Sequence, residues 1–314
     1  MFTEKERLER ALRQEEVDRP PCICPGGMMN MITTDLMDAC GVTWPEAHTD
    51  AQMMADLALA SYQHGCFENV GVPFCMTIEA EELGAKVTLG SKIFEPHVTE
   101  YAGTSVTEWK KSSPINLECG RAKVVLDAIR ILKEKNLDVP IIGNLVGPVS
   151  VASSVIDPVG FYKDLRRHKE EAHQFMTFVT EQLIAFANAM IENGADVIAI
   201  SDPSGTGEIL GPKFFEEYAV KYLNMLLDGI KDQEKGTIVH ICGQMRSVYE
   251  QIDKVHSDAL SFDAIVPLKE ARKNLQDRVL MGNVSTFALE FGDEERVQKL
   301  TKFCVQSGSD IISP

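Results

Sequence analysis

The feature that most constrains the fold is the alternation of short, almost continuously apolar segments with helical segments along the chain. Pro140–Leu145 and Ala195–Ile200 are examples of such apolar segments, and stretches with helical spacing lie between them. A strand that is apolar along its whole length is buried on both faces, as in a parallel sheet covered by helices. The pattern therefore predicts either a closed β/α barrel or a doubly wound sheet.

The individual segments can be placed from apolar periodicity, helix caps and Gly/Pro breaks. We predict strands at 22–24, 67–74, 140–145, 195–200, 236–243, 259–263, 278–283 and 310–313. We predict helices at 3–13, 49–63, 118–135, most of 158–194, 212–231, 245–254 and 294–306, and a loop-rich insertion with short strands at 88–114. The helix at 3–13 begins with a capping box, Thr3 to Glu6, and could cover one end of a larger body.

Polar residues at the ends of many different strands favour the barrel over the doubly wound sheet. No phosphate-binding glycine fingerprint follows the first strand, and in a barrel the carboxyl ends of all strands converge on one mouth. We therefore predict a single-domain (β/α)8 TIM-type barrel over residues 1–314 with an N-terminal helical extension. The polar residues expected at its mouth are Asn144, Asp202, His240, Cys242, Asp263 and Asn283.

His240 and Cys242 are the most informative of these residues. They lie two positions apart on one strand, so their side chains point to the same face. Imidazole nitrogen and thiolate sulfur are both zinc ligands, and this pair is our candidate metal site. The alternative is a core histidine bonded to the backbone beside a small buried cysteine.

The composition narrows the class of partner. A formal net charge of −16 argues against a nucleic-acid or anionic-membrane surface. Eight scattered cysteines, with no signal peptide and no apolar run of transmembrane length, indicate reduced thiols in the cytoplasm. Small molecules or a protein partner remain as the expected ligands.

Two further groups carry candidate site residues. Met28 and Met29 follow the glycine-rich turn after the first strand, where a soft apolar surface would suit a large flat cofactor as well as ordinary packing. Glu79 and Glu81 follow the second strand at the start of a helix, where acidic residues are common. Their spacing on a helix allows at most one of them to face the site.

Several segments together resemble the methylcobamide:coenzyme M methyltransferases within the uroporphyrinogen decarboxylase superfamily, and the resemblance covers essentially the whole chain. The segments that carry it are Asp18–Pro21, Pro25–Asn30, Glu68–Thr77, Ser201–Ser204, His240–Gly243 and Gly282–Asn283. The related porphyrinogen decarboxylases have an arginine-rich segment where this chain has Pro25–Asn30, so decarboxylation of a polyanionic porphyrinogen is not expected.

The resemblance implies a β/α barrel that binds zinc through His240, Cys242 and a later cysteine. It implies methyl transfer from a methylated corrinoid, carried by a small corrinoid protein, to a thiol such as coenzyme M. With this reaction in mind, we assign as catalytic candidates Asp202, Asn144, Asp263 and Glu79. We assign as corrinoid-binding candidates Met28, Met29 and Asn283. Asp202 and Asp263 are the alternatives for the acceptor that orients His240.

The third zinc ligand is the main departure from the family pattern. In the family it is a cysteine in a segment that would follow Ser313–Pro314, where this sequence stops. A barrel is also expected to finish with a helix over its last strand. We therefore expect a missing carboxyl end; in a complete chain, Cys24 would be the nearest replacement ligand.

Two other functions stay open on the sequence. A relative in the same superfamily could pass the methyl group to tetrahydrofolate, whose nitrogen needs a proton more than it needs thiolate activation. A non-catalytic barrel that binds corrinoid or metal is the second alternative.

Overall fold

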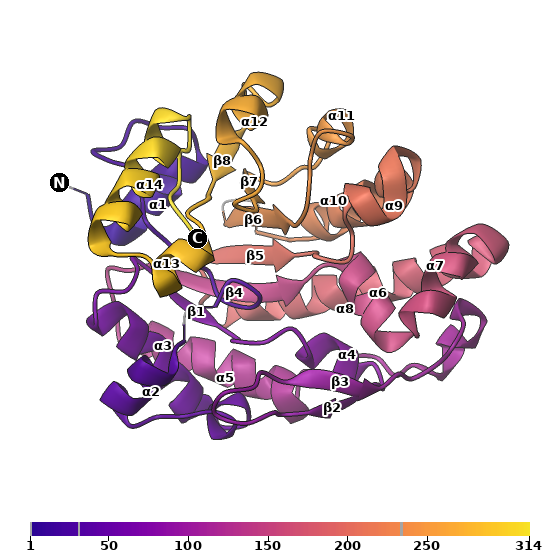
Figure 1. Cartoon of the computed structure of the whole chain (residues 1–314). Coiled ribbons are helices and arrows are strands. Elements are labelled where there is room, and N and C mark those ends of the chain that lie inside the picture. Colours follow the sequence, from indigo (N-terminus) through magenta and orange to yellow (C-terminus); the bar gives the residue numbers. More distant parts are fainter. Residues whose placement is uncertain (1, 31, 233–234) are drawn as a thin grey trace.

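Six parallel strands form the central sheet of the computed structural model, which describes residues 2–30, 32–232 and 235–314 (Figure 1). The strand order is β1-β4-β5-β6-β7-β8, so each strand from β4 onward pairs with the next strand of the sheet along the chain. Their bounds are β1 Val70–Val72, β4 Ile141–Val146, β5 Val197–Ser201, β6 Gly236–Ile241, β7 Ala259–Phe262 and β8 Val279–Met281.

Two shorter segments close this sheet into the predicted barrel. Met281 at the end of β8 forms a parallel bridge with Ile311, and Ile312 forms a parallel bridge with Cys22. The Ile23 amide donates to the Ile312 carbonyl at 2.9 Å, and the Glu68 amide, just before β1, donates to the Cys22 carbonyl at 2.9 Å. The described chain thus forms a closed ring in which no sheet edge is left open. The predicted barrel is confirmed.

Helices surround the strands (Figure 1). The α-helices are α1 Glu4–Leu12, α2 Thr34–Cys40, α3 Ala51–Gln63, α4 Ile78–Glu82, α5 Gly120–Glu134, α6 Pro148–Val155, α7 Pro158–Arg167, α8 Lys169–Glu192, α9 Gly207–Phe214, α10 Lys221–Asp228, α11 Tyr249–Ile252, α12 Leu268–Asn274, α13 Thr286–Phe291 and α14 Glu294–Gln306. Short 3-10 turns lie at η1 Glu46–His48 and η2 Val106–Lys111, and a π-helical turn, η3 Phe215–Val220, joins α9 to α10. None of the described helices is long and apolar enough to span a membrane.

The helix α1 closes the amino end of the barrel, in agreement with the expectation that it covers one end of a larger body. Leu8 and Leu12 are buried in one cluster with the inward-facing apolar residues of the strands. Gly236 opens β6 directly beneath this helix, where an added Cβ would lie 2.5 Å from Leu12 Cδ1. The capping box is present, because the Thr3 hydroxyl accepts from the Glu6 amide and the Glu6 carboxylate accepts from the Thr3 amide.

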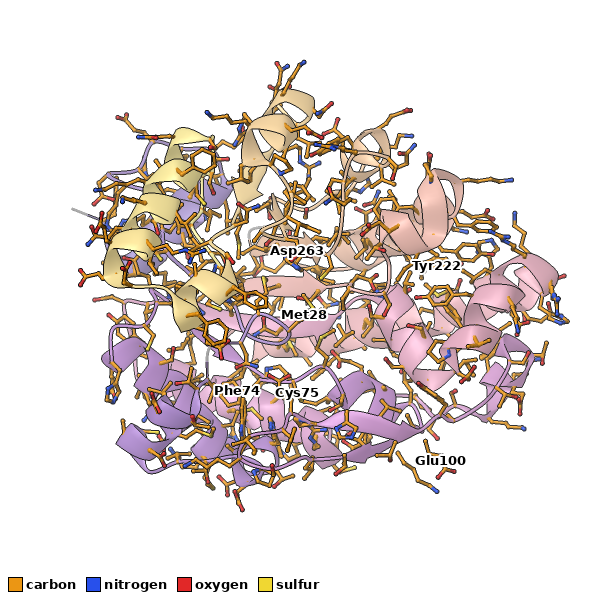
Figure 2. The ribbon with its side chains drawn as sticks, viewed as in Figure 1. Met28, Phe74, Cys75, Glu100, Tyr222 and Asp263 are labelled. Carbon is orange, nitrogen blue, oxygen red and sulfur yellow. The ribbon has the colours of Figure 1, made fainter. Side chains whose placement is uncertain are left out.

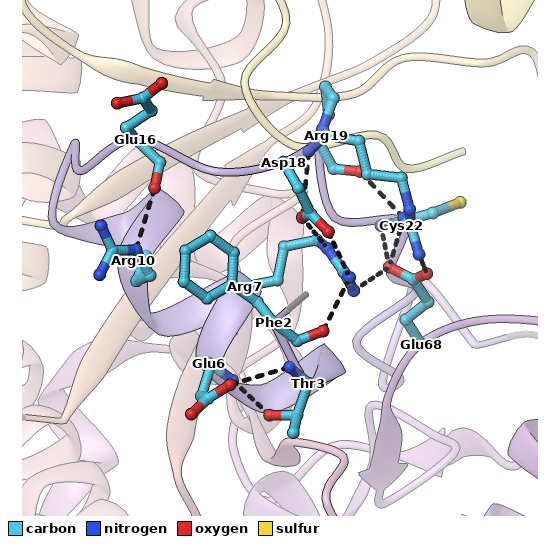
Figure 3. A network of polar contacts seen from close by, with 11 residues as sticks. Phe2, Thr3, Glu6, Arg7, Arg10, Glu16, Asp18, Arg19, Cys22 and Glu68 are labelled. Atoms are coloured by element: carbon cyan, nitrogen blue, oxygen red, sulfur yellow. Dashed lines mark hydrogen bonds and ion pairs between the residues drawn. The ribbon is translucent and has the colours of Figure 1, made fainter.

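A polar network fastens α1 to the first strand segment (Figure 3). Arg7 is 3% exposed, and its Nε donates to Asp18 Oδ1 at 2.8 Å. Glu68 pairs with Arg19 and accepts from the Cys22 amide at 3.0 Å. The network links α1, at the amino end of the barrel, to the segment around Cys22 that closes the ring of strands.

The insertion predicted at 88–114 leaves the barrel as a two-stranded hairpin. Strands β2 Lys86–Thr88 and β3 His97–Glu100 pair antiparallel and lie along the lower side of the view in Figure 1. Its connecting loop returns to the barrel mouth, where Asn30 Nδ2 donates to Glu95 Oε1 at 2.8 Å and to the Phe74 carbonyl at 3.2 Å.

Candidate functional site

His240 and Cys242 meet at the carboxyl end of β6. Parallel pairing with β5 and β7 buries the His240 side chain, which is 4% exposed, and places it level with Ser201 and Ser261 on those strands. Cys242 is half-buried one pleat further on, and its Sγ lies 3.4 Å from His240 Nε2. The period of the strand therefore brings together the two side chains that the sequence predicted to share a face.

The partner of the second imidazole nitrogen is a hydroxyl and not a carboxylate. His240 Nδ1 lies 2.9 Å from Ser261 Oγ, and Ser261 is fully buried. We expected either Asp202 or Asp263 in this position, and that expectation is wrong. The carboxylates are directed elsewhere because each caps a backbone amide at the start of a loop or helix.

Burial keeps both candidate ligands neutral. It lowers the pKa of His240 to about 4, a shift that the nearby Asp263 partly opposes. Burial also raises the pKa of Cys242 to about 12, with smaller contributions from the negative charges of Asp263 and Asp202. At neutral pH the imidazole is thus in the form that ligates metals, while the thiol keeps its proton until a cation arrives.

The pair fits zinc in geometry and in donor chemistry. Two ligands on a tetrahedral zinc, with bonds of about 2.0–2.1 Å to nitrogen and about 2.3 Å to sulfur, lie about 3.5 Å apart. The observed Nε2–Sγ separation is 3.4 Å. Within residues 2–30, 32–232 and 235–314 no group of three or more His, Cys, Asp or Glu side chains is arranged to hold a metal. His240 and Cys242 are therefore a pair of candidate ligands and not a complete metal site within the described residues.

The loop that carries Met28 and Met29 covers this pair. Met28 Sδ lies 3.8 Å from Cys242 Sγ, and Met29 Sδ lies 3.8 Å from Ser261 Oγ. The Cys24 thiol, which we considered as a replacement ligand, donates to the Met29 carbonyl at 2.7 Å and so anchors the loop. Met28 and Asp263 both lie near the centre of the view in Figure 2, whereas Glu100 lies at its lower edge.

Asp263 and Asn283 fix the loops around the mouth. Asp263 Oδ2 accepts from the Gly243 amide at 2.9 Å, directly beside Cys242. Asn283 Nδ2 donates to the Asp263 carbonyl at 2.7 Å and to the Val266 carbonyl at 2.8 Å. The ends of β6, β7 and β8 are thus held together by side chains that the sequence predicted at the mouth.

Asp202 is fully buried at the end of β5, and its carboxylate caps α6. Its Oδ1 accepts from the Ser150 amide at 2.8 Å and the Ser150 hydroxyl at 2.6 Å, and its Oδ2 accepts from the Val149 amide at 3.3 Å. An anion at a helix N-terminus is stabilised by the free amides there. Burial nevertheless raises the pKa of Asp202.

Asn144 ties the first turn to the barrel wall. Its Nδ2 donates to the Pro25 carbonyl at 2.8 Å and to the Val72 carbonyl at 3.2 Å. Gly71 has to be a glycine here, since an added Cβ would lie 1.7 Å from the Pro25 oxygen. The contacts of Asn144 hold the backbone of the loop that leads to Met28.

Glu79 is the acidic residue of its helix that faces inward. It is 1% exposed, whereas Glu81 forms an ion pair with Arg121 at 2.8 Å. Glu79 Oε1 accepts from the Val146 amide at 2.9 Å, and Oε2 has no hydrogen-bond partner among the described residues. Burial raises its pKa to about 7. The expectation that at most one of the two glutamates faces inward agrees with this arrangement.

Ser261 is the residue of this site that the sequence analysis missed. A serine inside an apolar strand is common, and the sequence of β7 does not indicate that His240 on β6 lies beside it. One available signal was its position two residues before Asp263, which places both side chains on the same face. Its contact with His240 depends on the register between β6 and β7, which single-sequence patterns do not give.

Comparisons with known proteins agree on one family. The family model for uroporphyrinogen decarboxylase (URO-D) matches residues 3–314. The chain is 36% identical to the methylcobamide:CoM methyltransferase MtbA of Methanosarcina acetivorans, over 100% of this chain and 92% of that protein. It is 34% identical to the methylcobamide:CoM methyltransferase MtaA of Methanosarcina barkeri, with the same coverage.

A solved structure shows the same fold. A methyltransferase from Methanosarcina mazei superimposes with a TM-score of 0.90 at 33% identity, covering 100% of this chain and 93% of that one. The likeness extends over the whole barrel, including its closing segments.

Proposed function

The chain belongs to the uroporphyrinogen decarboxylase family, and from this membership we propose that it is a zinc-dependent methyltransferase. The methyl group would pass from a methylated corrinoid to a thiol such as coenzyme M. The observation that carries the proposal is the 3.4 Å separation of His240 Nε2 and Cys242 Sγ at the barrel mouth. The relatives named as methylcobamide:CoM methyltransferases support the substrate classes.

His240 and Cys242 would hold the zinc ion. When bound, zinc would stabilise the thiolate of the acceptor and so supply a nucleophile at neutral pH. Asp263 and Asp202 favour a cation there, because their negative charges contribute to the raised pKa of Cys242. The third ligand that the family resemblance implies, a further cysteine thiolate, is part of this proposal.

The residues of the mouth would position the two substrates. Met28 is half-buried beside Cys242 and offers an apolar, polarisable surface to the flat corrin ring. Asp263 and Asn283 hold the loops at the ends of β6, β7 and β8, beside Cys242. Asn144 holds the loop that carries Met28. In the transfer a sulfur–carbon bond forms as the cobalt–carbon bond breaks, the electron pair stays on cobalt, and the thiol proton leaves to solvent. A small corrinoid protein would present the methyl donor at this mouth.

The experiment follows the spectrum of methylcobalamin under anaerobic conditions, with the zinc content of the protein measured in parallel. We expect about one zinc per chain and loss of the methyl–cobalt spectrum in the presence of coenzyme M. A parallel sample receives tetrahydrofolate in place of the thiol and should show no change.

The other outcomes separate the alternatives. Loss of the spectrum with tetrahydrofolate alone would contradict the thiol acceptor and favour the pterin-dependent reaction. Bound zinc with no spectral change in either sample would contradict turnover with free methylcobalamin and favour the non-catalytic barrel.

A further inference from the structure

We propose that Ser261 is a positioning residue that fixes the tautomer of His240 and thereby directs the Nε2 lone pair toward Cys242. The inference rests on the proposed zinc site for its consequence, although the tautomer itself is a property of the metal-free chain. Ser261 lies level with His240 in the parallel register of β6 and β7, and the two side chains are 0% and 4% exposed. Their Oγ–Nδ1 distance is 2.9 Å.

We infer the direction of this hydrogen bond from a third residue, Met29, which lies beside Ser261. The Ser261 hydroxyl is placed to donate to Met29 Sδ at 3.8 Å. A hydroxyl has one hydrogen, so with that hydrogen on sulfur the oxygen is free to accept from His240 Nδ1–H. Nε2 then carries the lone pair and faces the Cys242 thiol at 3.4 Å.

This arrangement matters because a neutral imidazole has one donor nitrogen and one acceptor nitrogen. With the hydrogen on Nδ1, Nε2 can bind a metal without rearrangement. With the hydrogen on Nε2, the position beside Cys242 would be blocked. Hydrogen-bond partners behind a metal-binding histidine generally set its tautomer and contribute about 10–100-fold to metal affinity.

The first test is the tautomer in the metal-free protein. Ring ¹H–¹⁵N spectra of the ¹⁵N-labelled chain distinguish the two tautomers, and His240→Gln identifies the His240 signals among those of the seven histidines. We expect the Nδ1–H form in the native chain and a loss of that preference in Ser261→Ala. Met29→Leu removes the sulfur that accepts the hydroxyl hydrogen, and an intermediate loss is expected there.

The second test is zinc affinity, measured by competition with a chromophoric chelator. Ser261→Ala should weaken zinc binding by about 10–100-fold. Ser261→Thr keeps the hydroxyl and should restore most of the affinity. Ser201→Ala is the matched control, because Ser201 lies level with His240 on the opposite neighbour, β5, and is also buried. Thermal unfolding of each variant shows that it is folded.

The inference is overturned if Ser261→Ala keeps both the native tautomer and the native zinc affinity. It is also overturned if Ser201→Ala weakens binding as much as Ser261→Ala does, since the effect would then be one of packing. If the native chain binds no zinc, the proposed function fails, and the tautomer spectra alone decide the role of Ser261.

Discussion

Cys242 and Cys24 show how the neighbours of a buried thiol decide its use. Both cysteines lie near the barrel mouth, and burial raises the pKa of both thiols. Cys24 donates its hydrogen to a backbone carbonyl, whereas Cys242 lies beside an imidazole nitrogen. The sequence predicted that His240 and Cys242 share a face, because this depends on strand periodicity alone. It did not predict Ser261, because the register between strands is set by tertiary packing.

Replacing Cys242 with alanine tests the metal site at this scale. We expect Cys242→Ala to lower zinc content strongly and to abolish methylation of the thiol. The barrel should stay folded, since truncating one small thiol costs about 1 kcal/mol of unfolding free energy. The measurements are zinc content, the methylcobalamin assay and thermal unfolding.

The control for loss of a thiol is Cys66→Ala, because Cys66 is exposed. It should keep native zinc content and native activity. Native zinc content in Cys242→Ala would contradict the zinc assignment.

At the level of elements, the Glu79 carboxylate hydrogen-bonds to an amide of β4 that lies beyond the end of the neighbouring strand β1. Strand β1 ends at Val72, while β4 runs to Val146, so the last amide of β4 has no partner on β1. Glu79, from α4, accepts from that amide at 2.9 Å. The sequence placed Glu79 on a helix after the second strand but gave no sign of this contact, because it depends on where two strands of unequal length end.

Glu79 should make the unfolding free energy fall as pH rises, whereas an acidic residue with a lowered pKa has the opposite effect. Its pKa in the folded chain, about 7, lies above the ordinary value of 4.5. The folded chain therefore binds this proton more tightly, so the stabilisation is present below about pH 4.5 and is lost as pH rises through 7. Glu79→Gln removes the titration and keeps an oxygen for the Val146 amide.

From pH 5 to pH 8 the unfolding free energy of Glu79→Gln should therefore improve relative to the native chain by roughly 2–3 kcal/mol, given the rise in pKa from 4.5 to about 7. Denaturant unfolding at the two pH values measures the change. Glu290→Gln, at an exposed position, is the control and should show no such trend. An equal difference between variant and native chain at both pH values would contradict the raised pKa.

At the scale of the whole molecule, the sequence predicted a closed barrel better than it predicted each strand. The alternation of apolar strands and helices placed all the segments of the ring. The predicted strand 67–74 is β1, Val70–Val72, in the structure, and the segments at 22–24 and 310–313 form isolated bridges and not strands. Their boundaries depend on hydrogen bonds between distant parts of the chain, which local patterns do not specify.

Closure of the ring can be measured by hydrogen exchange. The amides of Ile23 and Ile312 donate across the closing segments at 2.9 and 2.8 Å. They should exchange as slowly as amides in the middle of β5 and β6, because a closed barrel opens cooperatively and has no fraying edge. Val98, in the hairpin outside the barrel, should exchange faster. Fast exchange at Ile23 and Ile312 would contradict closure.

Closure of the amino end of the barrel by α1 also has a kinetic consequence for the proposed reaction. Leu8 and Leu12 close the amino end of the described barrel, so both proposed substrates would reach His240 and Cys242 from the carboxyl end of the strands. In the proposed reaction the small thiol would therefore bind before the bulky corrinoid carrier covered the mouth. The carrier would then leave before the methylated product, so the proposed reaction would follow a fixed order of binding and release.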